Sequence, residues 1–306
     1  MSNPQVSKDA TILKKTVLLR RKPSTSSRPP LKKGTLVGKI LFYGLIGFFL
    51  LNLVGLVGSV LVDSFGERWF GTWLPANWTG RWYEYIGSDH NMGQLLTNTL
   101  FVAVTTTLIA LLVGFPAAYI LARKQFRFKG LLTGFYLLPM LIPPLAYGIP
   151  LATFLIRQDL HRSLAGIILL NLVPVLPFVI LILAPFIEQV DVSLESASRI
   201  LGANRFQTFR RVVLPLVIPG LLTAGLLSLV RTIAMFELTF LIADANTQTL
   251  VVALYGDAFG AGIRPNQAIS AMAVIYMATT MALLVFALIF IKPTQFVVQL
   301  KSNKSK

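Results

Sequence analysis

Two charged side chains interrupt an otherwise apolar segment, and they are the residues of this sequence best placed to act on a polar solute. Arg231 and Glu237 lie within residues 216–243, whose composition predicts a membrane span. A charge at the centre of a bilayer costs on the order of 3 kcal/mol, so each group needs a partner on another helix or in water. Along one helix, six positions correspond to a rotation of about 240°, so the two side chains do not face each other. The alternative is that one of them lies beyond a misjudged span end and reaches the interface.

We therefore predict that Glu237 lies near a pathway across the membrane and that Arg231 is a structural or gating group. Tyr147, Asn171 and Phe236 are further candidate pathway residues within predicted spans. Interhelical hydrogen bonds are the alternative role for the polar groups of Tyr147 and Asn171.

The chain offers little for catalysis or for metal binding. It has no cysteine, its two histidines, His90 and His161, are far apart in sequence, and it has no Gly-x4-Gly-Lys-Ser/Thr stretch that would bind nucleotide phosphates. We expect no catalytic residue, no metal site and no cofactor on this chain. Energy for uphill transport would have to come from another polypeptide.

Residues 191–215 form a polar stretch between two long apolar segments, and the first half has the pattern of a short amphipathic helix. Asp191 or Ser193 can cap this helix, and Glu195 in its first turn faces the positive end of the helix dipole. Its expected apolar stripe consists of Leu194, Ala197, Ile200 and Leu201.

The second half of the stretch predicts a turn and another short helix. Gly202 suits the left-handed conformation of a helix stop, and Asn204 with Gln207 three residues later has the pattern of a capping box. Pro215 would close this second helix or bend it into the next segment. A helix-turn-helix with an apolar face, surrounded by arginines, is suited to binding another protein.

This stretch resembles the EAA loop of the permease subunits of type I ABC importers. Small residues follow an acidic one, Leu-Gly-Ala comes next, and thirteen positions separate the glycine from the proline of a Leu-Pro pair. Gly202, followed by Ala203, matches the glycine of the loop, and Leu214 and Pro215 match its Leu-Pro. A generic basic cytoplasmic loop is the alternative.

The sequence departs from the family pattern at the acid of the loop. Ser196, Ala197 and Ser198 fall on the Glu-Ala-Ala triplet, and Glu195 lies one position before it. Whether Glu195 makes the contact of the family acid is left open. A second pattern, Gly-x-Pro-Ala-Ala-Tyr at 114–119, resembles the start of the shared permease core and extends the resemblance to about residues 94–290.

The resemblance implies a coupling helix in residues 191–215 that docks into a separate ATPase subunit, which binds ATP-Mg. It also implies a second permease subunit, identical or homologous, two ATPase subunits in all, and a periplasmic solute-binding protein. The implied residues for ATPase coupling are Glu195, Ser196, Ala197, Ser198, Gly202, Ala203, Leu214 and Pro215.

Composition and charge agree with a membrane protein. The 306 residues are 55% hydrophobic and 13% charged, with a mean hydropathy of +0.70, whereas charged residues make up about a quarter of soluble domains. Ten Lys/Arg and one Asp in residues 1–39 predict a disordered basic tail against anionic lipid, which keeps the N-terminus cytoplasmic. This placement of charge favours membrane lipid over nucleic acid as the partner.

Apolar segment lengths and cation clusters predict an all-α polytopic membrane protein with six spans and both termini cytoplasmic. The family resemblance implies that the membrane is the bacterial inner membrane and that the protein has a cytoplasmic coupling helix. The predicted parts are an N-terminal tail (1–40), a first span (41–62), a periplasmic loop (63–94), a type-1 transporter core (95–291) and a C-terminal tail (292–306). Within the core, the predicted spans are 95–121, 131–156, 163–187, 216–243 and 268–291, and the coupling loop is 191–215. Prolines in the third and fourth spans predict bends that border a pathway, with simple packing kinks as the alternative.

The solute is the least determined part of the prediction. Residues 231–240 resemble the spermidine/putrescine group of these permeases more than the sugar group, and Glu237 suits an ammonium group. We therefore expect a polyamine, with a carbohydrate or polyol as the alternative. The alternative from another class is a standalone channel or secondary carrier, which an inverted repeat would favour.

Overall fold

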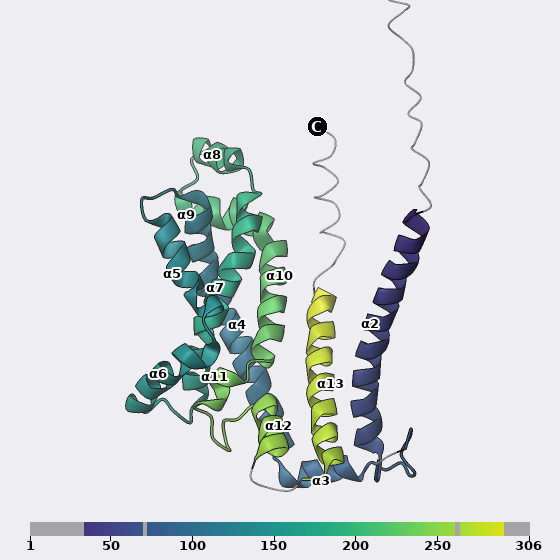
Figure 1. Ribbon diagram of the computed structural model, residues 1–306. Helices are drawn as coiled ribbons and strands as arrows, with labels where there is room; N and C mark the ends of the chain where they lie inside the picture. The colour runs from purple at the N-terminus through teal and green to yellow at the C-terminus, as the bar shows by residue number, and fades with distance from the viewer. Residues whose placement is uncertain (1–33, 70–71, 261–263, 291–306) are drawn as a thin grey trace, which may run out of the picture. The chain divides into compact units, whose positions relative to one another are not determined.

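The computed structural model describes residues 34–69, 72–260 and 264–290, and its regular elements there are helices (Figure 1). The chain divides into two compact units, residues 1–56 and 57–306, which are described separately. In chain order the helices are α2 (Gly34–Phe65), α3 (Arg81–Asp89), α4 (Met92–Arg123), α5 (Lys129–Leu141), α6 (Pro144–Arg157), α7 (Leu164–Glu188), α8 (Val192–Ile200), α9 (Arg205–Thr208), the π-helical turn η1 (Phe209–Val213), α10 (Leu214–Ile233), α11 (Glu237–Phe240), α12 (Leu250–Phe259) and α13 (Asn266–Phe290).

The number of possible spans agrees with the prediction. Within the described residues, five helical segments are long and apolar enough to cross a membrane, and six result if α5 and α6 count as one broken span. The predicted all-helical polytopic fold is therefore confirmed.

The first unit contains most of α2. Residues 34–40, predicted as part of the tail, already belong to this helix, while residues 1–33 lie outside the described part of the chain. The predicted first span, 41–62, lies wholly within α2. Its side chains from Ile40 to Leu56 are exposed on all sides of the helix.

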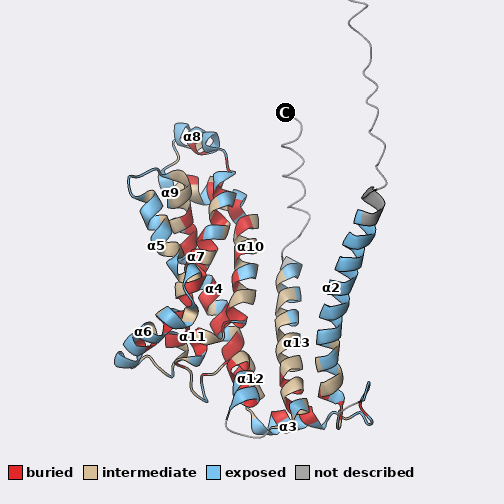
Figure 2. Cartoon of the chain, viewed as in Figure 1, coloured by how far each residue is buried: buried red, intermediate tan, exposed pale blue. Residues whose placement is uncertain are grey.

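The core of the second unit is the packing of α4, α7 and α10 against one another, where buried residues concentrate (Figure 2). Small and branched side chains fill it, as is typical of helix contacts in membranes. The fully buried members include Ala110, Ala118, Val179, Leu183, Val217 and Ala224. Gly220 lets α10 approach α7 closely, because a Cβ there would lie 2.6 Å from Cγ of Phe186.

The prolines act differently in the two spans where bends were predicted. The third span is broken, because α5 ends at Leu141, α6 begins at Pro144, and the two helices meet at 96°. Pro143 favours an extended residue before it, and Ile142 is extended with ψ near 138°. The fourth span remains a single helix, α7, through Pro174, Pro177 and Pro185. The prediction of a bent span is thus correct for the third, while the prolines of the fourth do not interrupt its helix.

The predicted fifth span, 216–243, is wrong at its end. The long helix stops at Ile233, residues 234–236 are not α-helical, and Glu237 opens the separate four-residue helix α11. The mostly apolar residues between Arg231 and Glu237 hid this break from the sequence analysis. Arg231 and Glu237 therefore lie on different helices, so the predicted rotation between them along one helix does not apply.

Pro215 does not end the second helix of the polar stretch. Residues 205–233 pass as one helical segment through α9, η1 and α10. Proline lacks the N–H that would bond back to the carbonyl of residue 211, and the wide turn η1 directly precedes it. The backbone hydrogen-bonding pattern changes to that of a π-helix in η1, and the helical segment continues.

Candidate functional site

Asp191 starts the exposed helix α8, as one of the two predicted caps. Its Oδ1 accepts a hydrogen bond from the backbone N–H of Ser193 at 2.8 Å. This backbone hydrogen bond, with a further one from the Ser193 side chain, holds the pKa of the Asp191 carboxyl below its usual range. The cap is therefore ionised at neutral pH and lies at the positive end of the helix dipole.

The turn between α8 and α9 is closed by hydrogen bonds at both of its ends. Gly202 has φ +88°, and the N–H groups of Gly202 and Ala203 donate to carbonyl oxygens in the last turn of α8 at 3.0 Å each. This pair of bonds is a Schellman motif. The predicted capping box is present, with reciprocal bonds between Asn204 and Gln207 of 2.8 and 2.9 Å.

Glu195 points into the molecule rather than toward a partner. Its side chain is 4% exposed, and Oε1 lies 2.8 Å from Nε of Arg123 at the end of α4. Oε2 accepts a hydrogen bond of 2.6 Å from the hydroxyl of Tyr119 and lies 3.7 Å from the exposed Arg199 guanidinium. The carboxylate of Glu195 thus fastens α8 to α4 within this chain.

We call α8 the first arm of the polar stretch, and α9 with η1 the second arm. The second arm is also fixed to α4. The hydroxyl groups of Ser198 and Thr208 share a hydrogen bond of 2.8 Å that links α8 to α9. The ring of Phe209 packs against Phe115 and Tyr119, with centroid distances of 4.9 and 5.3 Å. Both arms are therefore attached through Tyr119 and its neighbours on α4.

The outer side of the two arms carries exposed apolar groups. Ile200 is 86% and Leu201 is 87% exposed. Val192, Leu194, Ile200, Leu201 and Phe206 are exposed together on α8 and α9, and we call them the α8–α9 surface. Exposed arginines 199, 205, 210 and 211 belong to the same segment. An apolar patch surrounded by charges is typical of a protein-binding surface.

The other predicted coupling residues divide between this surface and the helix behind it. Ser196 and Ala197 are exposed on α8, whereas Ser198 and Ala203 are half-buried. Leu214 is half-buried against the core and Pro215 is exposed, both at the start of α10.

The predicted pathway residues come from four different helices and the break before α11. Asn171 is buried in α7 and donates from Nδ2 to Oγ1 of Thr239 at 3.2 Å, an interhelical hydrogen bond. The guanidinium of Arg231, in the last turn of α10, lies 4.9 Å from the ring centroid of Phe178. The Tyr147 hydroxyl on α6 is buried and makes no hydrogen bond to any described residue.

Arg231 and Glu237 are not paired with each other. Within the described residues, no carboxylate lies within 4.0 Å of the Arg231 guanidinium, and its buried Nε has no hydrogen-bond partner. Glu237, half-buried at the start of α11, makes no ion pair with a described residue either. Both charges are therefore available to water or to a solute.

The structure brings together an ionic cluster that the sequence analysis missed. Nε2 of His90 lies 2.9 Å from Oδ2 of Asp257 on α12 and 3.5 Å from Oδ2 of Asp89 on α3. These ligand-type atoms lie within 4.8 Å of one another, a set that could hold a metal ion. Arg264, however, contacts both carboxylates and already compensates their charge. A separation of 167 residues between His90 and Asp257 left no local signal in the sequence.

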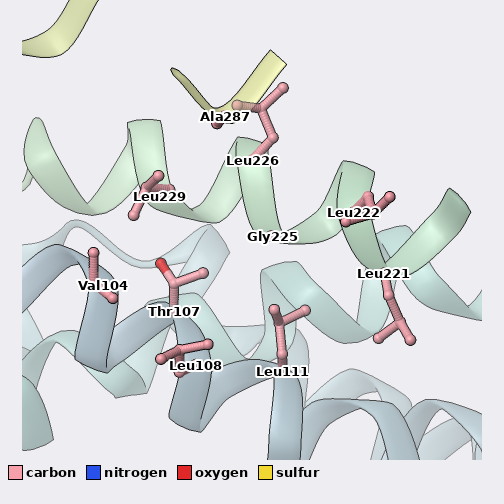
Figure 3. Close-up of a pocket in the computed structure, with 10 residues that line it drawn as sticks. All are labelled: Val104, Thr107, Leu108, Leu111, Leu221, Leu222, Gly225, Leu226, Leu229 and Ala287. Carbon is pink, nitrogen blue, oxygen red and sulfur yellow. The ribbon is translucent and has the colours of Figure 1, made fainter. Parts of the chain in front are cut away.

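An apolar groove of about 250 Å³ lies between α4, α10 and α13 (Figure 3). Its lining consists of Val104, Thr107, Leu108, Leu111, Leu221, Leu222, Gly225, Leu226, Leu229 and Ala287. Thr107 supplies the single polar side chain of this lining. The groove is therefore suited to hydrocarbon and offers little to a polar solute.

Residues 110–294 match the family described as the binding-protein-dependent transport system inner membrane component. The chain belongs to this family. It is thus a multi-pass inner-membrane permease of an ABC importer, and membership favours the importer prediction over a standalone channel or carrier. The match begins inside α4 and includes the α8–α9 surface and every candidate pathway residue.

Individual relatives of the permease are named for sugars and for molybdenum. The trehalose transport system permease protein SugB of Mycobacterium tuberculosis is 31% identical over 224 residues, which are 72% of this chain and 80% of that protein. A probable molybdenum ABC transporter permease protein of Haloferax volcanii is 34% identical over 155 residues, 48% of this chain and 58% of that protein.

Among solved structures, the permease resembles a chain of a bacterial ABC transporter involved in the import of the acidic polysaccharide alginate. The TM-score is 0.71 at 19% identity, and the match covers 87% of this chain and 99% of that one. At this identity the likeness establishes the fold alone.

Proposed function

We propose that this permease forms one half of the solute pathway of a binding-protein-dependent importer and receives mechanical work from a separate ATPase. ATP-Mg would be bound by that ATPase and not by this chain. The complete system would contain a second permease, identical or homologous, two ATPase subunits and a periplasmic solute-binding protein, with both termini of this permease in the cytoplasm.

The observation that carries this proposal is the α8–α9 surface. Its apolar side chains are exposed, yet the two arms behind them are capped and fastened to α4 by Glu195 and Phe209. Loose loops do not present apolar groups on such a rigid support. A groove on the ATPase would cover Ile200, Leu201 and Phe206.

The second arm gives a direct mechanical connection to the candidate pathway. Residues 205–233 form one helical segment, which we call the rod. At a rise of about 1.5 Å per residue, the rod is about 40 Å long. Phe206 lies at one end of this rod and Arg231 at the other. A displacement of α9 by the ATPase would therefore move Arg231 relative to Glu237, which lies beyond the break at 234–236.

We propose a carbohydrate as the solute. The relatives named for trehalose, sulfoquinovosyl glycerol and diacetylchitobiose support it, and the relatives do not support the polyamine expected from residues 231–240. Arg231 can donate hydrogen bonds to sugar hydroxyl groups, and Glu237 can accept hydrogen bonds from them. The polyamine prediction relied on the resemblance of residues 231–240 and on Glu237, and it gave no weight to Arg231, which repels an ammonium group.

A small oxyanion is the second candidate, and Arg231 is the observation that favours it. Its guanidinium lies in the last turn of a predicted span and has no carboxylate within 4.0 Å among the described residues. Guanidinium groups bind oxyanions through paired N–H donors. Several relatives are named for molybdenum, molybdate or tungstate.

Uptake by the reconstituted system tests these proposals. Proteoliposomes with the permease, its ATPase and its binding protein would be offered labelled trehalose, maltose, molybdate and putrescine in parallel. The proposal predicts ATP-dependent uptake of a sugar and none of putrescine. Uptake of molybdate alone would favour the second candidate, and uptake without an ATPase would contradict the importer function.

A further inference from the structure

Two aromatic side chains of α12 and two at the opposite ends of α11 form a continuous series of ring contacts, which we call the aromatic ladder. The ring centroids of Phe259 and Tyr255 are 4.9 Å apart, and Tyr255 lies 4.4 Å from Phe236 and 5.5 Å from Phe240. Phe236 and Phe240 stack at 5.2 Å.

The spacing within each helix produces the ladder. Tyr255 and Phe259 are four residues apart and share one face of α12, and Phe236 and Phe240 are likewise four apart, at the N-cap and the last residue of α11. Phe259 is 74%, Phe240 49% and Tyr255 39% exposed. The rings therefore offer faces and edges to whatever lies beside the protein. Figure 1 shows α11 and α12 in the half of residues 57–306 that lies away from α8.

Lipid is a poor occupant for this surface because a charge adjoins it. Glu237 lies three residues before Phe240, on the same side of α11, and has no ion pair within the described part of the chain. A carboxylate facing hydrocarbon costs on the order of 3 kcal/mol. Water, or a polar solute with apolar faces, satisfies both the rings and the carboxylate.

We propose that the aromatic ladder is a stacking surface for pyranose rings at the extracytoplasmic entrance of the pathway. This inference rests on the proposed carbohydrate import. The C–H groups on one face of a sugar ring carry partial positive charge and meet the negative faces of aromatic rings. Hydroxyl groups at the sugar's edge find an acceptor in Glu237 and donors in Arg231. An ammonium solute could stack similarly but would meet the uncompensated Arg231 charge.

Leucine substitutions test the ladder because they keep apolar volume and remove the aromatic face. In the proteoliposome system, Tyr255→Leu and Phe240→Leu should each lower the uptake rate of the transported sugar at sub-saturating concentration by about fivefold to tenfold. Tyr255→Phe retains the ring and should restore the rate. Phe154→Leu removes an exposed ring of α6 outside the ladder and is the matched control.

The outcomes separate the two levels of the proposal. Sugar uptake by the wild-type permease with unaltered rates in both leucine variants would overturn the ladder and leave carbohydrate import intact. A wild-type permease that takes up molybdate or putrescine and none of a panel of labelled mono- and disaccharides would overturn carbohydrate import and the ladder with it. An equal loss in Phe154→Leu would show a general effect of ring removal and also count against the ladder.

Discussion

Replacing Glu195 with alanine tests whether a buried carboxylate holds the exposed helix α8 in place. The side chain is 4% exposed, and its oxygens contact Arg123 at 2.8 Å and Tyr119 at 2.6 Å. After the substitution, the Arg123 guanidinium keeps the carbonyl of Val190 as its hydrogen-bond acceptor among the described residues. Removing one partner of a buried ion pair costs about 3–5 kcal/mol. The population with α8 detached from α4 should therefore rise by a factor of roughly 100 to 4,000.

Hydrogen exchange of the α8 backbone amides measures this change. In the permease embedded in lipid nanodiscs, Glu195→Ala should accelerate exchange over residues 192–200 by at least about a hundredfold, while exchange in the core of α7 stays the same. The ATPase activity stimulated by solute should fall in parallel, because a detached α8 cannot transmit a displacement to α4.

Arg199→Ala is the matched control for the Glu195 substitution. Arg199 also faces the carboxylate, but at 3.7 Å and with 53% of its side chain exposed. Exposed ion pairs contribute about 0–1 kcal/mol, so exchange should change by less than about fivefold. Unchanged exchange in Glu195→Ala, or equal acceleration in both variants, would refute the reasoning. The charge swap that combines Glu195→Arg with Arg123→Glu should recover part of the loss.

Three further experiments test other parts of the account. Gly202→Val places a branched residue at φ +88°, where no neighbour lies within 4 Å, so the energetic cost of at least about 1–2 kcal/mol comes from the backbone alone. The variant should insert into the membrane normally but show reduced solute-stimulated ATPase activity. Undiminished activity would argue against a role of the turn in coupling. Gly220→Val forces a side chain against Phe186, and this overpacking of about 1–3 kcal/mol should lower the melting temperature of the permease in detergent. Gly130→Val is the control, because open space surrounds Gly130. Equal melting temperatures of the two variants would contradict the close packing at Gly220. In intact cells without an outer membrane, Trp73→Cys should react with an impermeant maleimide while Ile200→Cys should not, and the reverse pattern would invert the predicted topology.

The side-chain chemistry of short sequence stretches was enough to predict the features that neighbouring residues form. The cap at Asp191, the helix stop at Gly202 and the box between Asn204 and Gln207 each depend on groups within a few positions of one another. The apolar segments likewise indicated spans because length and composition alone decide whether a helix crosses a bilayer. These features were therefore open to prediction.

Features that depend on distant residues were not predictable. Glu195 lies one position before the family triplet, and its hydrogen-bond partner in the structure, Tyr119, lies 76 residues away in the sequence. The break after Ile233 occurs within an apolar run, so no change in composition marks it. The presence of prolines did not distinguish the two proline-rich spans either, because those of α7 lie within one continuous helix, whereas the helix is broken between α5 and α6.

A single-cysteine cross-link tests the central claim most directly. The chain has no native cysteine, so Ile200→Cys carries the single thiol of the permease and can be fitted with a photoreactive maleimide in the purified complex. We predict a cross-linked product with the ATPase subunit whose yield changes when ATP is added, and none from Trp73→Cys, which is 97% exposed in the loop before α3. Absence of the product from Ile200→Cys, or its formation from Trp73→Cys, would contradict the proposal that the α8–α9 surface receives the work of the ATPase.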